Sequence, residues 1–255
     1  MVSPLYDCAD ATKRVRGLGA ARRAVSAGKL IVLPTDTVYG VGADAFSSTA
    51  VAALLAAKGR GRDMPVPVLV GAPETLAGIA ITNDAVDALV EAFWPGGLTL
   101  VCREQPSLHW DLGRTEGTVA VRMPRQDIAL ELLRETGPLA VSSANVTGQP
   151  PARTAAQARE QLGDAVAVYL EAGMTDDDVP STIVDVTGDM PRVLRAGAVG
   201  EDEVHAVVAA ARAAAAQGSA PEPGTATASE VAPDPDDAPD AGSIAAPEPD
   251  APAGS

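Results

Sequence analysis

Cysteine, histidine and aromatic residues are scarce in this sequence, and their scarcity excludes several classes of protein. The 255 residues include two cysteines, two histidines and 3% aromatic residues. Cys8 and Cys102 stand far apart without metal-ligand spacing, which excludes a zinc-ribbon site and a disulfide scaffold. His109 and His205 have no obvious catalytic partner, and we expect both to be structural. These features predict a protein of the reducing cytosol.

Long apolar runs are also missing. No stretch approaches the roughly 20 apolar residues that a membrane-spanning helix needs, and the N-terminus lacks the apolar core of a signal peptide. We therefore expect a cytoplasmic protein with no membrane partner.

Positive charge is in short supply, with 19 Lys and Arg against 34 Asp and Glu and a net charge of −15. Residues 217–255 hold eight of the acidic residues and no cation, and Ala, Pro, Gly, Ser and Thr make up almost all of the rest. Such a segment buries too little apolar surface to fold, which predicts a disordered tail after a domain of residues 1–216. The remaining 26 acidic and 19 basic residues leave that domain at −7, which argues against a protein whose main task is gripping nucleic acid.

Hydrophobic periodicity indicates an α/β domain built on one substantial sheet. Apolar, β-branched runs predict strands at 30–35, 66–70, 98–102, 118–122, 138–142, 165–170, 181–186 and 192–195. Amphipathic stretches predict helices near 10–27, 48–58, 83–93, 126–136, 154–162 and 201–216. The helix at 154–162 opens with the capping box "TAAQ" and is expected to stop at Gly163.

The stretch "AAKGRGRDMPVPVLV" (56–70) concentrates cations in this acidic chain. Lys58, Arg60 and Arg62 alternate with glycines, so an extended backbone would point all three to one side. Such an arrangement would hold a polyanion. A solvated turn between a helix and a strand is an equally good interpretation of this stretch alone.

Small polar residues follow several predicted strands, where loops display binding groups on a rigid core. Thr35 stands in "PTDTVYG", and "SSAN" supplies Ser142, Ser143 and Asn145, whose hydroxyl, amide and backbone donors suit phosphate oxygens. Ordinary hydrogen-bonded turns explain either segment taken alone. The sequence contains neither GxGxxG after a strand nor GxxxxGK[ST], so any nucleotide site uses a different cradle.

Six separated motifs together resemble one known family. They are "PTDTVYG", "KGR", "WPGGLTL", "VAVRMP", "SSAN" and "STIVD" followed by "PRVLRAGA". In this order, from about residue 28 to 199, they resemble the YrdC-like threonylcarbamoyl-adenylate synthases, in a short single-domain form. The resemblance implies a twisted mixed sheet with flanking helices around a concave cavity.

The resemblance also implies a reaction. L-Threonine and bicarbonate or CO₂ give a carbamate, which attacks the α-phosphate of ATP to form threonylcarbamoyl-AMP and pyrophosphate for the N6-threonylcarbamoyladenosine modification of tRNA. By similarity, Lys58 and Arg60 are expected to be catalytic, and the nucleotide site to comprise Lys58, Arg60, Ser142, Ser143, Asn145 and Arg195. By the same similarity, the threonine site is expected to comprise Thr35, Arg60, Thr118 and Ser181.

The expected cofactor is Mg²⁺ carried with ATP, with no metal ligand from protein side chains. Proteins of the tRNA threonylcarbamoyl-transferase assembly are expected partners, with weak or indirect contact to tRNA itself. Met64 departs from the polar residue of many relatives, so a polar contact there is lost or moves to Arg62. Two alternatives stay open: an RNA-binding or ribosome-assembly module, and carbamoyl transfer through carbamoyl-AMP.

Overall fold

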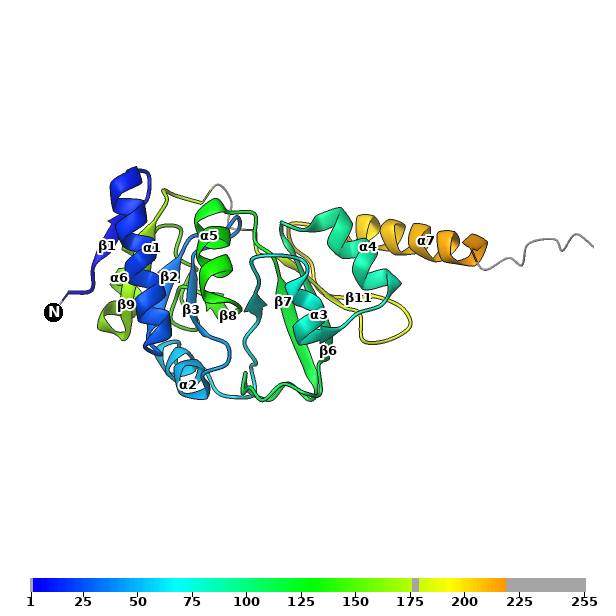
Figure 1. Ribbon diagram of the computed structural model, residues 1–255, viewed down its shortest axis with the longest axis horizontal. Helices are drawn as coiled ribbons and strands as arrows, with labels where there is room; N and C mark the ends of the chain where they lie inside the picture. Colours follow the sequence, from blue (N-terminus) through cyan, green and yellow to red (C-terminus); the bar gives the residue numbers. More distant parts are fainter. Residues whose placement is uncertain (1, 176–178, 219–255) are drawn as a thin grey trace, which may run out of the picture. The chain divides into compact units, whose positions relative to one another are not determined.

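The computed structural model describes residues 2–175 and 179–218, which form one mixed sheet with helices on both faces (Figure 1). The strands are β1 Leu5–Asp7, β2 Leu30–Leu33, β3 Gly40–Asp44, β4 Val68–Leu69, β5 Ala80–Ile81, β6 Leu98–Glu104, β7 Thr118–Arg122, β8 Leu139–Ser143, β9 Val166–Glu171, β10 Thr182–Asp185 and β11 Arg192–Arg195. The helices are α1 Ala11–Ser26, α2 Ser48–Ala57, α3 Thr75–Ile79, α4 Asp84–Phe93, α5 Asp127–Thr136, α6 Ala155–Leu162 and α7 Glu201–Gly218, with a 3₁₀ turn at Gly163–Ala165. Of the predicted tail, only residues 217–218 fall within this description.

The sheet order is β1-β9-β2-β3-β8-β4-β7-β6-β10-β11, and β5 pairs with β6. The sheet contains both parallel pairs (β1 with β9, β2 with β9, β4 with β7, β6 with β10) and antiparallel ones, which confirms the predicted mixed α/β sheet. This order brings β3 and β8 next to β4 and β7, although some 80 residues separate β3 from β7 along the chain. Polar residues at the ends of these strands are therefore neighbours in space.

Both faces of the central strands are buried. In β2, Leu30 and Val32 pack on one face, while Ile31 and Leu33 join the second core, and all four are almost fully buried. Helices α1 and α5 cover the second face, side by side in Figure 1, and α2 and α6 pack on the first. Such two-sided burial explains why β2 is a continuous apolar run.

Local sequence signals set the helix boundaries. Asp10 caps α1 by accepting from the backbone N–H groups of Thr12 and Lys13. Thr154 caps α6 by accepting from Gln157 N, and the helix ends before Gly163 as predicted. The reciprocal half of the capping box differs, because Gln157 Oε1 accepts from Arg153 N instead of from the capping residue.

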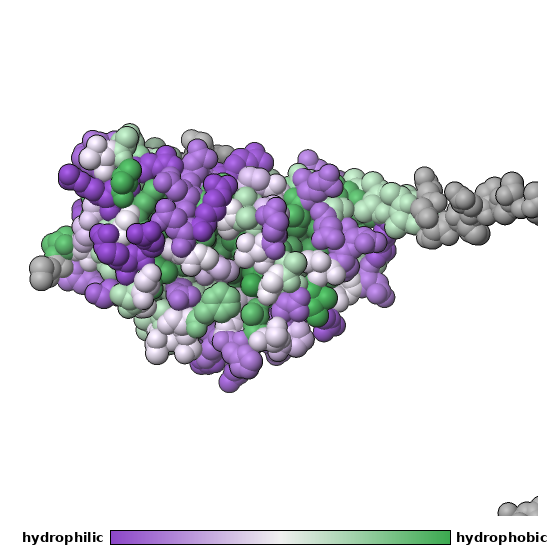
Figure 2. Space-filling view, viewed as in Figure 1, coloured by the Kyte–Doolittle hydropathy of each residue, from purple (hydrophilic) through white to green (hydrophobic). Residues whose placement is uncertain are grey.

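The hydropathy of the surface follows this architecture. Figure 2 shows hydrophilic residues gathered over α1 and α5, and pale, weakly hydrophobic residues along the part of α7 that leads to the grey trace. The pale colour reflects the alanines of α7. The buried residues of this helix, Val204 and Val208, belong to its first half. No helix among the described residues is both long and apolar enough to span a bilayer.

Candidate functional site

A cavity of about 440 Å³ collects polar side chains from segments that are far apart in the sequence. Its described lining contains three arginines and no aspartate or glutamate, in a chain of net charge −15. The polar side chains that line it belong to Thr35, Thr37, Tyr39, Arg60, Thr99, Arg122, Ser142, Ser143, Ser181 and Arg195. Its size is within the range of small-ligand sites, and its charge suits an anionic ligand.

Arg122, at the end of β7, is a buried cation held in a fixed orientation. Its Nε donates to Gly96 O at 2.8 Å, Nη1 to Thr37 Oγ1 at 2.9 Å, and Nη2 to Asp36 Oδ1 at 2.5 Å. Burial lowers the pKa of Arg122, and the charge of Asp36 opposes that shift. Arg122 was not among the residues predicted from the sequence; its position at the end of a strand within the "VAVRMP" motif was the available signal.

Arg195, at the end of β11, is joined to two hydroxyls of the cavity. Its Nε and Nη2 donate to Ser181 O at 3.1 and 2.7 Å, and Nη2 also lies 3.1 Å from Ser181 Oγ. Ser181 Oγ in turn lies 2.8 Å from Thr99 Oγ1. Gly197 allows this close packing, because a Cβ there would lie 2.3 Å from Pro180 O. The structure thus places both predicted residues, Arg195 and Ser181, in the cavity.

The predicted Thr35 and its neighbour Thr37 form a buried hydroxyl pair on the loop between β2 and β3. Thr35 Oγ1 donates to Val38 O at 2.6 Å, accepts from Thr37 N, and lies 3.1 Å from Thr37 Oγ1. These bonds fix the loop, as a polar turn would, and still place the hydroxyls on the cavity wall. The segment is therefore a hydrogen-bonded turn, and the binding role of Thr35 stays a prediction.

Arg60 enters the cavity from the C-terminal end of α2. Gly59 has a φ of +62°, and the N–H groups of Gly59 and Arg60 bond back to Ala56 O and Leu55 O. This is a Schellman motif, which turns the chain sharply away from the helix axis. Arg60 Nε is buried and has no hydrogen-bond partner among the described residues. An unsatisfied buried donor of a cation indicates a place for an anionic group.

The same turn overturns the expectation that three alternating cations face one side. Lys58 is 1% exposed and lies behind the Ser142–Asn145 loop, and it is not among the residues that line the cavity. Its Nζ donates to Ser143 O at 2.5 Å and to Asn145 O at 2.7 Å, with both side-chain oxygens of these residues within 3.4 Å. The structure thus shows Lys58 in contact with this loop, and its direct contact with phosphates stays a prediction.

Arg62 points away from the cavity as well. Its guanidinium forms two hydrogen bonds to the carboxylate of Asp111, so it does not supply the polar contact that was expected to move there from position 64. Met64 itself lines the cavity and is 44% exposed. The segment is not extended, since Lys58 caps α2 in a helical conformation, and this is why the period of two fails.

Two further predicted residues do not line the cavity. Asn145 is buried, and its amide group bonds Val146 O, Gln149 O and Lys58, which makes it a support of the loop. Thr118 opens β7, four residues or about 13 Å from Arg122 at the cavity end, and its hydroxyl donates to Thr115 O. Thr118 therefore lies at the opposite end of its strand from this cavity, and its assignment to the threonine site stays a prediction.

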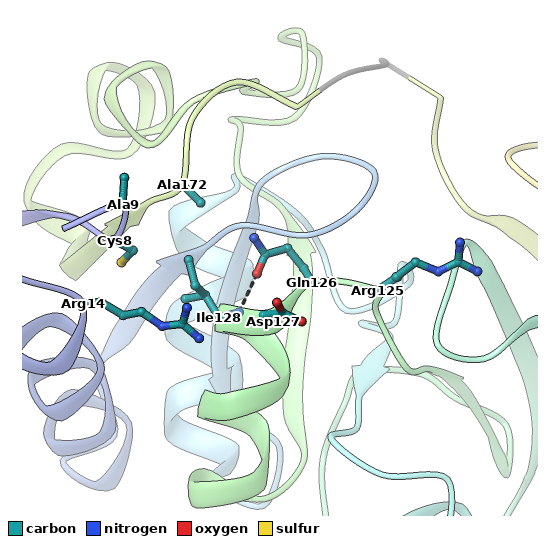
Figure 3. A pocket seen from close by; sticks show the side chains of 8 residues that line it. All are labelled: Cys8, Ala9, Arg14, Arg125, Gln126, Asp127, Ile128 and Ala172. Carbon is teal, nitrogen blue, oxygen red and sulfur yellow. Dashed lines mark hydrogen bonds between the residues drawn. The ribbon is translucent and has the colours of Figure 1, made fainter. Parts of the chain in front are cut away.

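A separate hollow of about 360 Å³ lies by the N-terminus of α5, between α1 and β9 (Figure 3). No residue predicted from the sequence lines it. Arg14 there is paired with Glu131, and burial raises the pKa of the Cys8 thiol to about 11, so the thiol is un-ionised at neutral pH. This hollow lacks the convergent cations of the larger cavity.

Metal ligands do not gather anywhere in the described residues, where no group of three or more His, Cys, Asp or Glu side chains is placed to hold an ion. The cavity lining offers hydroxyl and guanidinium donors instead of carboxylates. These residues do not fit a divalent cation held by the protein alone, since Mg²⁺ prefers oxygen anions.

Comparison with known proteins gives one consistent match. A family model for Sua5, YciO and YrdC, described as "Telomere recombination", matches residues 23–197. A putative threonylcarbamoyl-AMP synthase of Mycobacterium tuberculosis is 58% identical over 204 residues, covering 80% of this chain and 94% of the relative. The threonylcarbamoyl-AMP synthase of Pyrococcus abyssi is 36% identical over 184 residues, and the chain spans about half (54%) of its length.

The fold agrees with the sequence match. Sua5 of Pyrococcus abyssi, solved in complex with L-threonine, superimposes with a TM-score of 0.73 at 32% identity, over 80% of this chain and 61% of that one. The family model covers well over half of the residues, and the mycobacterial relative is matched almost along its whole length. The chain therefore belongs to the Sua5, YciO and YrdC family.

Proposed function

We propose that this protein is an L-threonylcarbamoyladenylate synthase. The observation that carries the proposal is a single cavity whose described lining contains three arginines, several hydroxyl side chains and no carboxylate. Its substrates, ATP, a carbamate and the carboxylate of threonine, are all anionic. Relatives named threonylcarbamoyl-AMP synthase, and a related Sua5 that binds L-threonine, support the same assignment.

In the proposed reaction, the amine of L-threonine and bicarbonate or CO₂ first give a carbamate. A carbamate oxygen then attacks the α-phosphorus of ATP, the bond from that phosphorus to the bridging oxygen breaks, and pyrophosphate leaves with its electron pair. This chemistry needs orientation and charge neutralisation more than a general base. The guanidinium groups of Arg60, Arg122 and Arg195 all line the cavity and are suited to both tasks, since guanidinium donors match the oxygens of carboxylates and phosphates.

The cavity offers two kinds of wall, and we assign a substrate to each. The wall with Thr35, Thr37, Thr99 and Ser181 has paired hydroxyls beside Arg122 and Arg195, which suits the hydroxyl, amine and carboxylate of threonine. The wall with Ser142 and Ser143 is proposed for the AMP moiety, with Lys58 and Asn145 fixing its loop from behind. Arg60 lies on the loop after α2, and we assign it to the carbamate and the α-phosphate, the groups that react.

We propose that Mg²⁺ enters with ATP on its phosphate oxygens, because the described lining supplies no carboxylate to hold the ion. The product would pass to a tRNA threonylcarbamoyl-transferase assembly, and the cytoplasm is the proposed compartment. The excess of acidic over basic residues in the domain counts against the RNA-binding alternative. The second alternative is carbamoyl transfer through carbamoyl-AMP. The wall with Thr35, Thr37, Thr99 and Ser181 favours threonine over a simple carbamoyl group, because threonine has a hydroxyl group for these side chains to bind.

The decisive experiment measures pyrophosphate release from ATP, with L-threonine and bicarbonate each omitted in turn. We expect release only when all three are present. L-Serine should be turned over roughly 10- to 200-fold less efficiently, because one methyl group in a fitted pocket contributes about 1–3 kcal/mol. Turnover that does not depend on threonine would refute the assignment.

A further inference from the structure

The loop that carries Arg60 is held by a second loop that the family resemblance does not single out. Residues 58–67 connect α2 to β4, and residues 105–117 connect β6 to β7. The two loops meet around Arg62, whose side chain is turned away from the cavity that Arg60 lines. Their contacts bear directly on the position of Arg60.

One ion pair and two backbone hydrogen bonds join the loops. Arg62 Nη1 and Nη2 donate to Asp111 Oδ2 and Oδ1 at 2.8 and 2.7 Å. Arg114 N donates to Arg62 O at 2.7 Å, and Val66 N donates to Leu112 O at 3.1 Å. These contacts fix the chain on the C-terminal side of Arg60, just as the Schellman turn fixes it on the N-terminal side.

Close backbone packing reinforces these contacts. Gly113 has a φ of +104°, and a Cβ there would lie 2.9 Å from Arg62 O and 3.3 Å from Pro65 Cα. A larger residue at 113 would therefore push the two loops apart. The second loop is itself anchored, because Leu112 is 1% exposed and Trp110 stacks on Phe46 with ring centroids 5.6 Å apart.

We propose that the Arg62–Asp111 pair is a positioning clamp, which holds the loop so that the guanidinium of Arg60 stays aimed into the cavity. The inference rests on the proposed function for its kinetic readout and on the loop contacts for its structural one. Arg62 and Asp111 touch no substrate in this proposal. They act through Arg60, whose buried Nε has no other partner to hold it among the described residues.

The test uses Asp111→Asn, Arg62→Gln and the charge-swapped double variant Arg62→Asp with Asp111→Arg in the full chain. We measure kcat and the KM for ATP in pyrophosphate release, and hydrogen exchange at the amides of Val66 and Arg114. Matched controls are Arg22→Gln and Glu135→Gln, which break a pair of similar exposure between α1 and α5.

Each single variant is expected to lower kcat/KM for ATP about tenfold and to speed exchange at both amides, since small misplacements of a catalytic group are costly. The charge-swapped variant should recover kcat/KM to within about threefold, and the controls should match the wild type. Unchanged kcat/KM in the single variants overturns the proposal, and so does a loss of kcat/KM with wild-type exchange rates or an equal loss in the controls.

The two proposals fail in different ways. If the wild-type protein releases no pyrophosphate, the proposed function fails, and the clamp is then decided by the exchange rates and by ATP affinity from calorimetry on the same variants. If the wild type is active and the single variants are indistinguishable from it, only the clamp fails.

Discussion

At the scale of single residues, Arg60 has a buried donor atom that no hydrogen-bond partner among the described residues satisfies. Its Nε is buried and unpartnered, whereas Arg122 and Arg195 each bond several protein oxygens. A buried donor atom without a partner costs free energy in the empty protein, and a bound phosphate or carboxylate oxygen would remove that cost.

Replacing Arg60 therefore separates function from stability. We expect Arg60→Ala to reduce the rate of pyrophosphate release on the order of 10²-fold or more, because it removes charge stabilisation at the reacting groups. The melting temperature should stay within a few degrees of the wild type. Arg16→Ala, on the exposed surface of α1, is the control and should leave both quantities unchanged. A near-normal rate for Arg60→Ala would remove it from the catalytic group.

The burial of Lys58 predicts how the stability of the protein depends on pH. Burial, with a smaller contribution from the charge of Arg60, lowers the pKa of Lys58 from 10.5 to about 8. Between these two values the unfolded chain binds a proton that the folded protein does not, so the free energy of unfolding rises with pH in this window. The full effect of Lys58 is on the order of 3 kcal/mol, since one pKa unit corresponds to about 1.4 kcal/mol.

Other groups act in the opposite direction at high pH, so the comparison must be made with Lys58→Met. Burial raises the pKa of Cys8 to about 11 and of Cys102 to about 12, and above pH 9 their thiols ionise more readily in the unfolded chain. The free energy of unfolding, measured with urea at pH values from 7.5 to 10.5, should rise more steeply with pH, or fall less steeply, for the wild type than for Lys58→Met. Parallel curves would mean that Lys58 keeps an ordinary pKa.

At the scale of secondary-structure elements, the turn at the end of α2 directs Arg60, the proposed catalytic side chain, into the cavity. Gly59 supplies the left-handed residue of the Schellman turn, and a Cβ at this position would meet no heavy atom within 4 Å. The cost of Gly59→Ala is then one of backbone conformation, about 1 kcal/mol.

For a chain of this size, that cost lowers the melting temperature by about 2–4 °C. The turn would also relax and displace Arg60, so the rate of pyrophosphate release should fall more than the stability loss explains. Gly59→Asn is the matched variant, because asparagine tolerates a positive φ, and it should retain more of both properties. If Gly59→Ala and Gly59→Asn lower the melting temperature and the rate equally, then the space around residue 59, and not its φ angle, accounts for the need for glycine.

The elements also show what sequence patterns can and cannot predict. Strands with β-branched residues were located, and the predicted 118–122 and 192–195 match β7 and β11 in the structure. Strand β3, Gly40–Asp44, was missed because its glycines show no alternating pattern; Val141 from β8 packs over Gly40 and occupies the place of a side chain. Polar residues that were predicted near strand ends, such as Thr35, Ser142 and Ser181, line the cavity, but Thr118 does not. The directions of the cations after α2 were not predicted correctly, because the turn there depends on one positive φ.

At the scale of the whole molecule, the acidic charge of the segment 217–255 contrasts with the arginines that line the cavity. The segment has almost no apolar area to bury and lies outside the described residues apart from its first two. At physiological ionic strength, charges interact strongly only within about 8 Å. Composition therefore predicts that this segment contributes little to stability or to ATP binding.

Deleting residues 219–255 tests that prediction and leaves α7 intact. The melting temperature should change by less than about 2 °C, and the rate of threonylcarbamoyl-AMP synthesis should stay within twofold at both low and moderate salt. A drop of several degrees, or a several-fold loss of rate at both salt concentrations, would show that the segment contributes to the fold or the site.

The sheet order also has a consequence for the order in which the protein acquires its activity during translation. The cavity takes one arginine from the loop after α2, one from β7 and one from β11, and β11 reaches the sheet only through β10. A ribosome needs roughly 10–40 s to synthesise the 195 residues that complete this set. Until then the emerging chain carries the loops of a nucleotide site without its last cation. A nascent polypeptide should therefore leave cellular ATP unbound until nearly the whole domain has left the exit tunnel.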